Sequence, residues 1–523
     1  MGTKNLNSAT NLITFTRASG GTALRKISYG NELVTNGNGT TTAGWTTSGA
    51  AIFTSDGSEF FVGRNGSGVT QGARQAGILT TGKVYKVTAD IISLTNTFSI
   101  YMGAATVEAE AKFTVVGSGQ VRYVAATGAD LFIQATAAGG ATATIDNISV
   151  KEVLYDQPDG TLQLFNSPAN VPRIEYDATG AVKGLLIEEA RTNLLPYSLL
   201  AHGSGWTQQY ATLTLGATTA PDGTSKASSL VESTSTSKHQ CYSTGIVTGV
   251  TTTYSIWIKA NTRSEILVSF ATAGQAKGAF FNLLTGEVGT VYSGYSASIV
   301  EGVDGWYRCS VTFTPSSSGT YYPAVMMSVS EGSSYTGDGT SGIYLWGAQV
   351  EAGSFPSSYI PTTGSTATRA ADVATIPRSS FGHHIKASTW VVEFTPTFPS
   401  VDTNQSVLYR YGSGYDFLIW STSANYMTAS YMASASSPHF PITANQTSKI
   451  AVVVKHGEYL SVCVDGGSIS QNSVLSNTTV HATTVTGWAD VDYKLGGDQL
   501  GHIKSVQYYP RRLTNTQLQE LTT

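Results

Sequence analysis

Residues 409 to 420 combine aromatic rings with a cation and a carboxylate. Sugar rings stack on flat aromatic side chains, while their hydroxyl groups bond to polar side chains. Alternation along a strand would place Tyr409 and Tyr411 on one face, with Tyr415 as a further candidate. The alternative is that part of these rings belongs to a hydrophobic core. We predict a glycan-binding cluster made of Tyr409, Arg410, Tyr411, Tyr415, Asp416 and Trp420.

The sequence lacks the residue patterns on which common hydrolases depend. A glycosidase needs two carboxylates that flank one bond, but the pair Glu188–Glu189 would point to opposite faces of a strand. A GxSxG nucleophile elbow and an HExxH zinc motif are both absent. We therefore predict that the chain is not an enzyme and has no catalytic residues, with a polysaccharide-degrading enzyme as the alternative.

Candidate metal ligands are sparse. Asp490 and Asp492 would share a strand face, with Asp498 nearby, and such carboxylates can hold calcium, although an ordinary loop is the competing interpretation. His383 and His384 would diverge in a strand, and no CxxC pair exists. The sequence predicts no cofactor and no metal site, and it leaves calcium open.

Composition and charge exclude several classes of protein. Charged residues make up 12% of the chain and the net charge is −4, without the run of Lys or Arg that a nucleic-acid-binding surface needs. The sequence contains no apolar stretch of about 18 residues, so we expect no membrane insertion. The N-terminus lacks the apolar run of a secretory signal. The three cysteines fit buried small side chains, with a Cys241–Cys309 bridge as the alternative. We expect a chain made in a cytoplasm, without nucleic acid or membrane as partner.

Strand signals recur along the whole chain. Alternating runs at 84–91, 253–259 and 306–313 are bounded by Gly, Asn, Pro or Ser, which is typical of β-strands with turns between them. A capping box from Thr514 to Gln517 predicts one short C-terminal helix. The chain is therefore predicted to be all-β.

Two long segments share one order of features. Residues 31–153 and 193–365 each open with an asparagine and a tryptophan, Trp45 and Trp206, and each continues through an apolar strand to a closing strand of alternating pattern. This order predicts a diverged repeat of a jelly-roll sandwich. Trp45, the run 82–91 and the closing run 145–153 resemble carbohydrate-binding-module-like jelly rolls of the galactose-binding-like and family 4/9/22 group. The resemblance implies a sandwich core rather than a particular sugar site.

The C-terminal segment, 366–523, has a different pattern. The strand at 390–394, the strand and DG turn at 460–466, and the run 506–513 that leads into the helix resemble the concanavalin A-like lectin/glucanase sandwich, in its laminin-G-like form. The ExDxxE strand of the glucanase members is absent. The resemblance therefore implies a lectin domain and not a glucanase site.

Three short motifs carry a further resemblance. FTRAS at 15–19, VPRIEYD at 171–177 and GLLIEEARTNLL at 184–195 resemble a set that recurs in tailed-bacteriophage virion proteins, ahead of jelly-roll and lectin-like modules. About 150 residues separate FTRAS from VPR here, so the first jelly roll is predicted to be inserted between them. The expected fold is three β-sandwich (jelly-roll) domains in tandem. The predicted segments are a linking region, 1–30 plus 154–192, a jelly roll, 31–153, a second jelly roll, 193–365, and a lectin domain, 366–523.

These resemblances imply a bacteriophage virion structural protein, a fibre, spike or decoration subunit that attaches to host-surface glycans. The alternatives are a virion-associated polysaccharide-degrading enzyme, a bacterial surface adhesin and a purely structural spacer. The implied location is the virion, and the implied partners are other virion proteins. The chain has few charged residues and many small polar ones, and an oligomer would bury part of that surface. We therefore also expect a homo-oligomer, a trimer in the case of a fibre.

Overall fold

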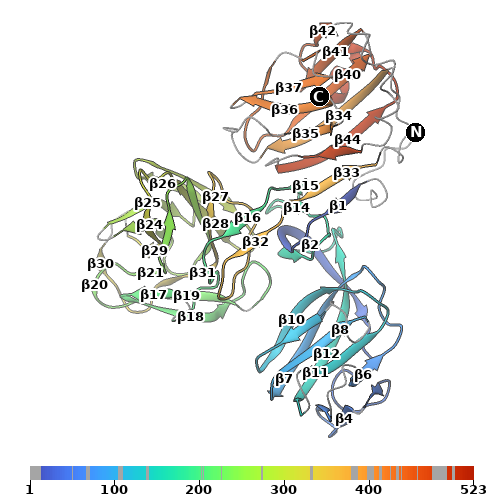
Figure 1. Cartoon of the computed structure of the whole chain (residues 1–523). Helices are drawn as coiled ribbons and strands as arrows, with labels where there is room; N and C mark the ends of the chain where they lie inside the picture. The colour runs from blue at the N-terminus through green and yellow to red at the C-terminus, as the bar shows by residue number, and fades with distance from the viewer. Residues whose placement is uncertain are drawn as a thin grey trace. The chain divides into compact units, whose positions relative to one another are not determined.

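The structure is a computed structural model of the chain. It describes residues 13–523 apart from 50, 66–70, 104–109, 137–139, 202, 204, 225, 273–274, 330–333, 378–386, 397–405, 412–414, 424–425, 432–434, 437–438, 456–457, 474–491 and 497–500. Antiparallel strands make up most of the described residues, and one short helix lies at the C-terminus (Figure 1). The predicted all-β class and the C-terminal helix are confirmed. In the described part of the chain, no helix is long and apolar enough to cross a membrane.

Two compact units are distinguished, Lys26–Thr161 and the rest of the chain. Two antiparallel sheets form the first of them. One sheet has the order β3 (Thr46–Ser48), β6 (Gly72–Gln75), β11 (Leu131–Thr136), β8 (Thr97–Met102), β9 (Glu110–Phe113). The other has the order β10 (Gly117–Ala125), β7 (Val84–Leu94), β12 (Thr142–Tyr155), β2 (Gly21–Glu32), β13 (Thr161–Ser167), with β5 (Phe60–Arg64) on β12 and β4 (Ala51–Ser55) on β5. Their facing apolar side chains form one core.

The two ends of this unit are neighbours in a sheet. Glu32 pairs with Lys151 and Ile27 with Tyr155, where β2 enters and β12 leaves. Adjacent ends are what an inserted domain requires, because the host chain must continue with little disturbance. β13 (Thr161–Ser167) follows and belongs mostly to the larger unit.

The larger unit contains a second sandwich between residues 194 and 365. One sheet has the order β17 (Trp206–Gln209), β21 (Gln240–Ser243), β29 (Gly319–Met327), β24 (Glu265–Thr272), β25 (Gln275–Asn282), β26 (Glu287–Val291), with β22 (Ile246–Thr248) also on β29. The other has the order β18 (Ala211–Thr218), β19 (Ala227–Glu232), β31 (Gly342–Ala352), β23 (Thr252–Ala260), β28 (Trp306–Phe313), β27 (Tyr295–Glu301). A two-stranded ribbon joins β20 (Thr236–Ser237) to β30 (Tyr335–Thr336).

The two jelly rolls share one topology. The order β3-β6-β11-β8-β9 matches β17-β21-β29-β24-β25, and β4-β5-β12-β7-β10 matches β18-β19-β31-β23-β28, strand for strand in chain order. The indole N–H of Trp45 donates to the carbonyl of Asn36 at 3.2 Å, and that of Trp206 donates to the carbonyl of Tyr197 at 3.0 Å, nine residues back in both copies. The sandwiches are therefore diverged copies of one fold, as the shared sequence features predict.

The C-terminal sandwich draws strands from distant parts of the chain. One sheet has the order β1 (Thr14–Thr16), β33 (Val373–Ile376), β43 (Tyr493–Leu495), β35 (Ser406–Tyr411), β36 (Tyr415–Ser423), β37 (Tyr426–Tyr431), β38 (Ala435–Ser436), with β39 (Phe440–Pro441) on β37. The other has the order β14 (Ile174–Tyr176), β15 (Val182–Ile187), β44 (Gly501–Tyr509), β34 (Ala387–Pro396), β40 (Ser448–Lys455), β41 (Tyr459–Val464), β42 (Ser470–Ser473). The predicted segment boundaries stay predictions. Each of these two sheets contains strands from more than one predicted segment.

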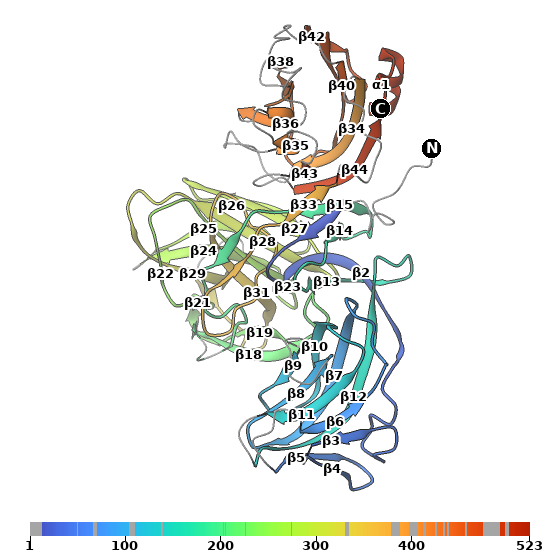
Figure 2. The same ribbon diagram turned by 45° about the vertical axis from the view of Figure 1, so that its right-hand side comes forward.

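Two strands from earlier in the chain, β1 and β15, contribute side chains to the core of this sandwich. Leu185 and Ile187 of β15 are buried among Trp390, Val392 and other core residues, and Phe15 packs against the same cluster. Gly184 has a φ of 126°, and a Cβ atom there would lie 2.5 Å from the carbonyl oxygen of Ile503, so the approach of β15 to β44 requires glycine. Figure 2 shows the two layers, with α1 (Asn515–Thr522) outside the sheet that contains β34 and β40.

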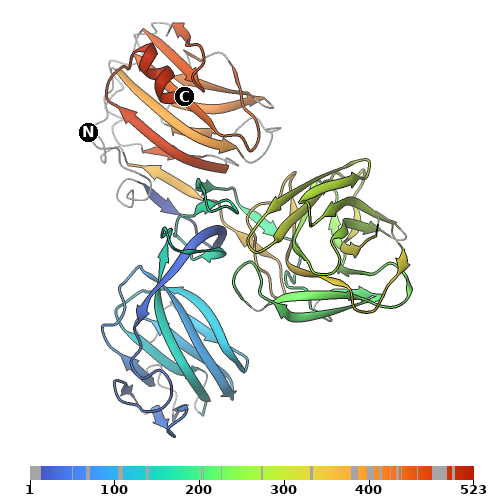
Figure 3. The ribbon, with the colours of Figure 1, turned by 180° about the vertical axis from the view of Figure 1, so that it is seen from behind.

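The terminal helix forms as the capping box predicts. The hydroxyl of Thr514 accepts from the backbone N–H of Gln517 at 3.3 Å, and the Gln517 side chain accepts from the backbone N–H of Thr514 at 3.0 Å. Leu518 is buried against Val391, Ala451 and Cys463. The same helix lies across the sheet when the molecule is seen from behind (Figure 3).

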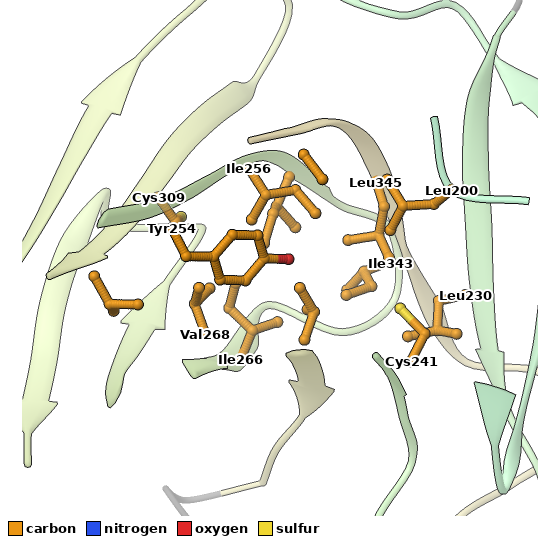
Figure 4. Packing of buried hydrophobic residues seen from close by; sticks show 14 of the residues in the cluster. Leu200, Leu230, Cys241, Tyr254, Ile256, Ile266, Val268, Cys309, Ile343 and Leu345 are labelled. Atoms are coloured by element: carbon orange, nitrogen blue, oxygen red, sulfur yellow. The ribbon is translucent and has the colours of Figure 1, made fainter. Parts of the chain in front are cut away.

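The core of the second sandwich contains a polar atom without a partner. Figure 4 shows the Tyr254 ring among aliphatic side chains, with Cys241 and Cys309 nearby. The Tyr254 hydroxyl is buried and makes no hydrogen bond within the described residues. All three cysteines are free and buried, so the structure contains no Cys241–Cys309 bridge, and burial raises the pKa of the Cys241 thiol to about 12. These thiols are structural rather than reactive.

The orphan hydroxyl generates a prediction about stability. Tyr254→Phe removes a buried polar group that has no partner, so it should raise the free energy of unfolding by about 1 kcal/mol. Tyr359→Phe is the matched control, because the buried Tyr359 hydroxyl is 2.7 Å from the Ser198 hydroxyl, and its loss should destabilise the protein. Urea titration of the full chain measures both. A Tyr254→Phe protein as destabilised as Tyr359→Phe would contradict the argument.

Candidate functional site

The predicted glycan-binding residues lie on two paired strands. Tyr409 pairs with Leu418 and Tyr411 with Tyr415 across β35 and β36, and the register shifts between Arg410 and Tyr411. The Tyr409 ring is partly buried, with the Lys494 ammonium 5.7 Å from its centroid. The other five predicted side chains lie outside the described residues, and the cluster stays a prediction: Arg410, Tyr411, Tyr415, Asp416 and Trp420.

The candidate metal ligands are mostly not placed either. Asp490, Asp498, His383 and His384 lie outside the described residues. Where the structure is described, it contains no group of three or more His, Cys, Asp or Glu side chains that could hold a metal ion. Calcium binding therefore stays untested.

The motifs FTRAS, VPRIEYD and GLLIEEARTNLL meet in a buried ionic cluster. Arg17 of FTRAS donates to the Asp372 carboxylate at 3.1 Å, and Arg173 of VPR donates to the other oxygen of the same carboxylate. The backbone N–H of Glu188, in GLLIEEARTN, also donates to Asp372 at 2.9 Å. Arg17, Arg173 and Asp372 have no exposed side-chain surface in these pairs. Arg17 thus binds a carboxylate that lies 355 positions further along the chain, and Arg173 shares it.

A second carboxylate completes this cluster, which we call the arginine hub (Arg17, Arg173, Glu188, Arg369, Asp372). Glu188 accepts from Arg173 at 2.8 Å and lies 3.5 Å from Arg369. Although burial acts in the opposite direction, Arg369 and Arg173 lower the pKa of Glu188 to about 2. A carboxyl group that stays ionised at neutral pH cannot serve as a general acid there.

Backbone carbonyl oxygens accept further hydrogen bonds from the arginines of the hub. Arg17 donates to the carbonyls of Ser167 and Pro168, and Arg369 donates to the carbonyl of Glu189 at 2.7 Å. Buried charges persist only when they are paired and hydrogen-bonded in this way. Glu188 and Glu189 bind different arginines, since Glu189 pairs with Arg191. Sequence reasoning missed Arg369 and Asp372, although the triplet Thr-Arg-Ala at 16–18 recurs at 368–370.

An aromatic surface lies on the second sandwich. The inner face of its β17-β21-β29-β24-β25-β26 sheet contributes Cys241, Val268 and Val325 to the core, so the alternate residues project from the opposite, outer face. One cross-strand row there contains Tyr242, Ala324, Ser269 and Gly278, and the next contains Gln240, Met326, Leu267 and Phe280. None of these eight residues is charged.

Rings border a floor of small residues on this outer face. Tyr242 and Tyr322 contact edge to face with centroids 6.4 Å apart, and Phe280 stacks with Tyr292 at 6.2 Å. Tyr322 is exposed, whereas the Ser269 hydroxyl between the two ring pairs is buried and has no hydrogen-bond partner among the described residues. An unsatisfied buried hydroxyl of this kind costs about 1–3 kcal/mol. Sequence reasoning missed this face because its strands are apolar on both sides.

Comparisons with known proteins give only distant matches. No protein-family model and no characterised protein sequence matches the chain. A tandem of CBM22 modules from Paenibacillus barcinonensis Xyn10C is 12% identical, with a TM-score of 0.21, over 62% of this chain and 98% of that one. A Trypanosoma rangeli sialidase is 11% identical, with a TM-score of 0.23, over 90% and 83% of the two chains. A sialic acid complex of that sialidase is 12% identical, with a TM-score of 0.22, over 96% and 93%.

These matches correct one prediction from the sequence. The statement that the chain is not an enzyme is wrong as it stands, because solved structures that match the chain include sialidases. A purely non-enzymatic role is therefore not carried forward. At these identities and TM-scores, the similarity assigns neither a reaction nor a ligand to this chain.

The arginine hub generates a prediction about acid stability. The folded pKa of Glu188 lies below its ordinary value of 4.5, so its contribution is complete above pH 4.5 and is lost as the pH falls through about 2. Glu188→Gln should destabilise the protein at pH 7 by on the order of 3 kcal/mol at most. The difference from wild type should shrink on acidification towards pH 2.

Urea midpoints measured from pH 7 to pH 2 test this prediction. Glu458→Gln is the control, because Glu458 forms an exposed pair with Lys455 and should have little effect at any pH. A difference between wild type and Glu188→Gln that is constant over the whole pH range would contradict the assignment.

Proposed function

We propose that the chain is a structural protein of a bacteriophage virion, a fibre, spike or decoration subunit, whose β-sandwiches bind host-surface glycans. The resemblance of three motifs to virion proteins supports the first part. In the structure these motifs supply Arg17, Arg173 and Glu188 to the arginine hub. Their side chains thus serve to hold a chain that carries several sandwiches, which suits a protein that displays binding modules.

The glycan part depends on the outer face around Tyr242 and Tyr322. The exposed Tyr322 ring, in contact with Tyr242, suits the apolar face of a sugar. Because the two cross-strand rows beside these rings carry no charge, an uncharged glycan is the expected ligand. The cluster from Tyr409 to Trp420 stays a second proposed glycan site on the C-terminal sandwich.

The proposal implies particular partners. Other virion proteins would hold the subunit in the particle, and copies of the chain would form a homo-oligomer, a trimer in the case of a fibre. A single weak glycan site gains useful affinity only when several copies act together. A capsid or tail array would provide that multivalency.

Glycan binding by the outer face can be tested with full-length protein. Tyr322→Ala and Tyr242→Ala should each weaken binding to neutral host polysaccharide about tenfold or more, because losing a stacked ring costs on the order of 1–3 kcal/mol. Tyr210→Ala is the control, since Tyr210 is 48% exposed and belongs to neither ring pair. Calorimetric titration, with product release followed in parallel, measures both binding and cleavage. Equal affinity in all three variants would contradict the site.

The virion assignment needs a separate measurement. Immunogold labelling with an antibody against the chain should decorate purified particles at one defined structure, head or tail. Particles without label, from a lysate in which the soluble chain is detected, would contradict the assignment. The full chain should be used in every assay, because β1, β14 and β15 belong to the sheets of the C-terminal sandwich.

A further inference from the structure

The shared topology of the two jelly rolls gives the strands β6, β11, β8 and β9 of one outer face counterparts in β21, β29, β24 and β25 of the other. In the first copy, Arg74, Phe132, Tyr101 and Glu110 form one cross-strand row on these strands. The next row contains Gln134, Ser99 and Lys112.

The two faces differ in chemistry. The rows described on the second copy are neutral, whereas those of the first contain Arg74, Glu110 and Lys112. Inner-face neighbours such as Ala73, Ile100 and Ala111 are buried in the core, so the charged residues belong to the outer face. The two copies therefore share the fold, while the outer face of the first carries charges in these rows.

Aromatic rings remain in the centre of this charged face. Tyr101 and Phe132 lie with centroids 6.3 Å apart, and the Tyr101 ring is partly exposed. Burial, and then the charge of Glu110, raise the pKa of the Tyr101 hydroxyl, so it remains a hydrogen-bond donor at neutral pH. Glu110 is itself bound by the Ser99 hydroxyl. The centre thus offers a ring for stacking next to a fixed acceptor and a donor.

Two cations lie on opposite sides of these rings. The Arg74 side chain is 50% exposed and has only a long contact, 3.5 Å, with the partly exposed Asp130. Lys112 is exposed on β9, and Arg74 lies on β6. Three strand spacings separate the two strands, which is about 14 Å. A chain of sugars that crosses the strands would meet one cation on each side of the stacked ring.

We propose that this face binds a linear anionic polysaccharide, whose acidic groups pair with Arg74 and Lys112 while a sugar ring stacks on Tyr101. The proposal rests on the proposed function in that it assigns glycan binding to the sandwiches, but it concerns a different copy and a different ligand class. One chain would then bind a neutral glycan with its second sandwich and an acidic glycan with its first.

The test uses the full chain and three probes: polygalacturonate for carboxylate groups, dextran sulfate for sulfate groups, and dextran as the uncharged polymer. Arg74→Gln/Lys112→Gln should weaken binding to the anionic probe at least tenfold without changing binding to neutral host polysaccharide. Lys83→Gln is the control for the loss of a surface cation elsewhere, because Lys83 is exposed and pairs with Glu152 on the other sheet. The anionic probe that binds identifies which acidic group is recognised.

The outcomes separate this proposal from the neutral site. Loss of anionic binding in the double variant, with wild-type affinity in Lys83→Gln and in Tyr322→Ala, would support it even if Tyr322→Ala left neutral-glycan binding unchanged. Equal losses in the double variant and in Lys83→Gln would show nonspecific charge attraction and overturn it. Failure of both anionic probes to bind the wild-type chain, or unchanged affinity of the double variant, would also overturn it.

Discussion

The larger unit depends on one buried carboxylate, Asp372. It accepts from Arg17, from Arg173 and from the backbone of Glu188, which come from three separate stretches of the chain. Removing one partner of a buried charge network leaves the others uncompensated, at a cost of about 3–5 kcal/mol. The hub therefore works as a junction that forms only when all of these stretches are present. Its residues hold together the chain segments that precede and follow each inserted sandwich.

This junction explains how a C-terminal sandwich can be built from distant strands. Along the chain, β1 directly precedes Arg17, β14 follows Arg173, β15 precedes Glu188 and β33 follows Asp372. All four strands belong to the sheets of the C-terminal sandwich. The chain can then carry a jelly roll between β1 and β14 and another between β16 (Arg191–Asn193) and β32 (Ala367–Arg369), which pair with each other. Each jelly roll keeps its own core, so its outer face can diverge without disturbing the host sandwich.

Sequence periodicity was sufficient to predict the local structure, but it could not predict the junction at the arginine hub. Alternation identified strands such as 253–259, and the matching positions of Trp45 and Trp206 identified the duplication, because both signals are local. Arg17 and Asp372 are 355 positions apart, and an isolated polar pair leaves no period in the sequence. The outer face of the second sandwich was missed for another reason: in β24, Leu267 and Val268 are both apolar and buried, so the pattern does not tell which face meets the core.

The most direct test of the junction is hydrogen exchange, followed by mass spectrometry, on Asp372→Asn in the full chain. If Asp372 holds the separate stretches together, exchange should become faster in β1, β14, β15 and β33. It should remain slow in β23 and β31, which lie in the independent core of the second sandwich. Unchanged exchange in all six strands would contradict the account, and so would a uniform increase in all of them.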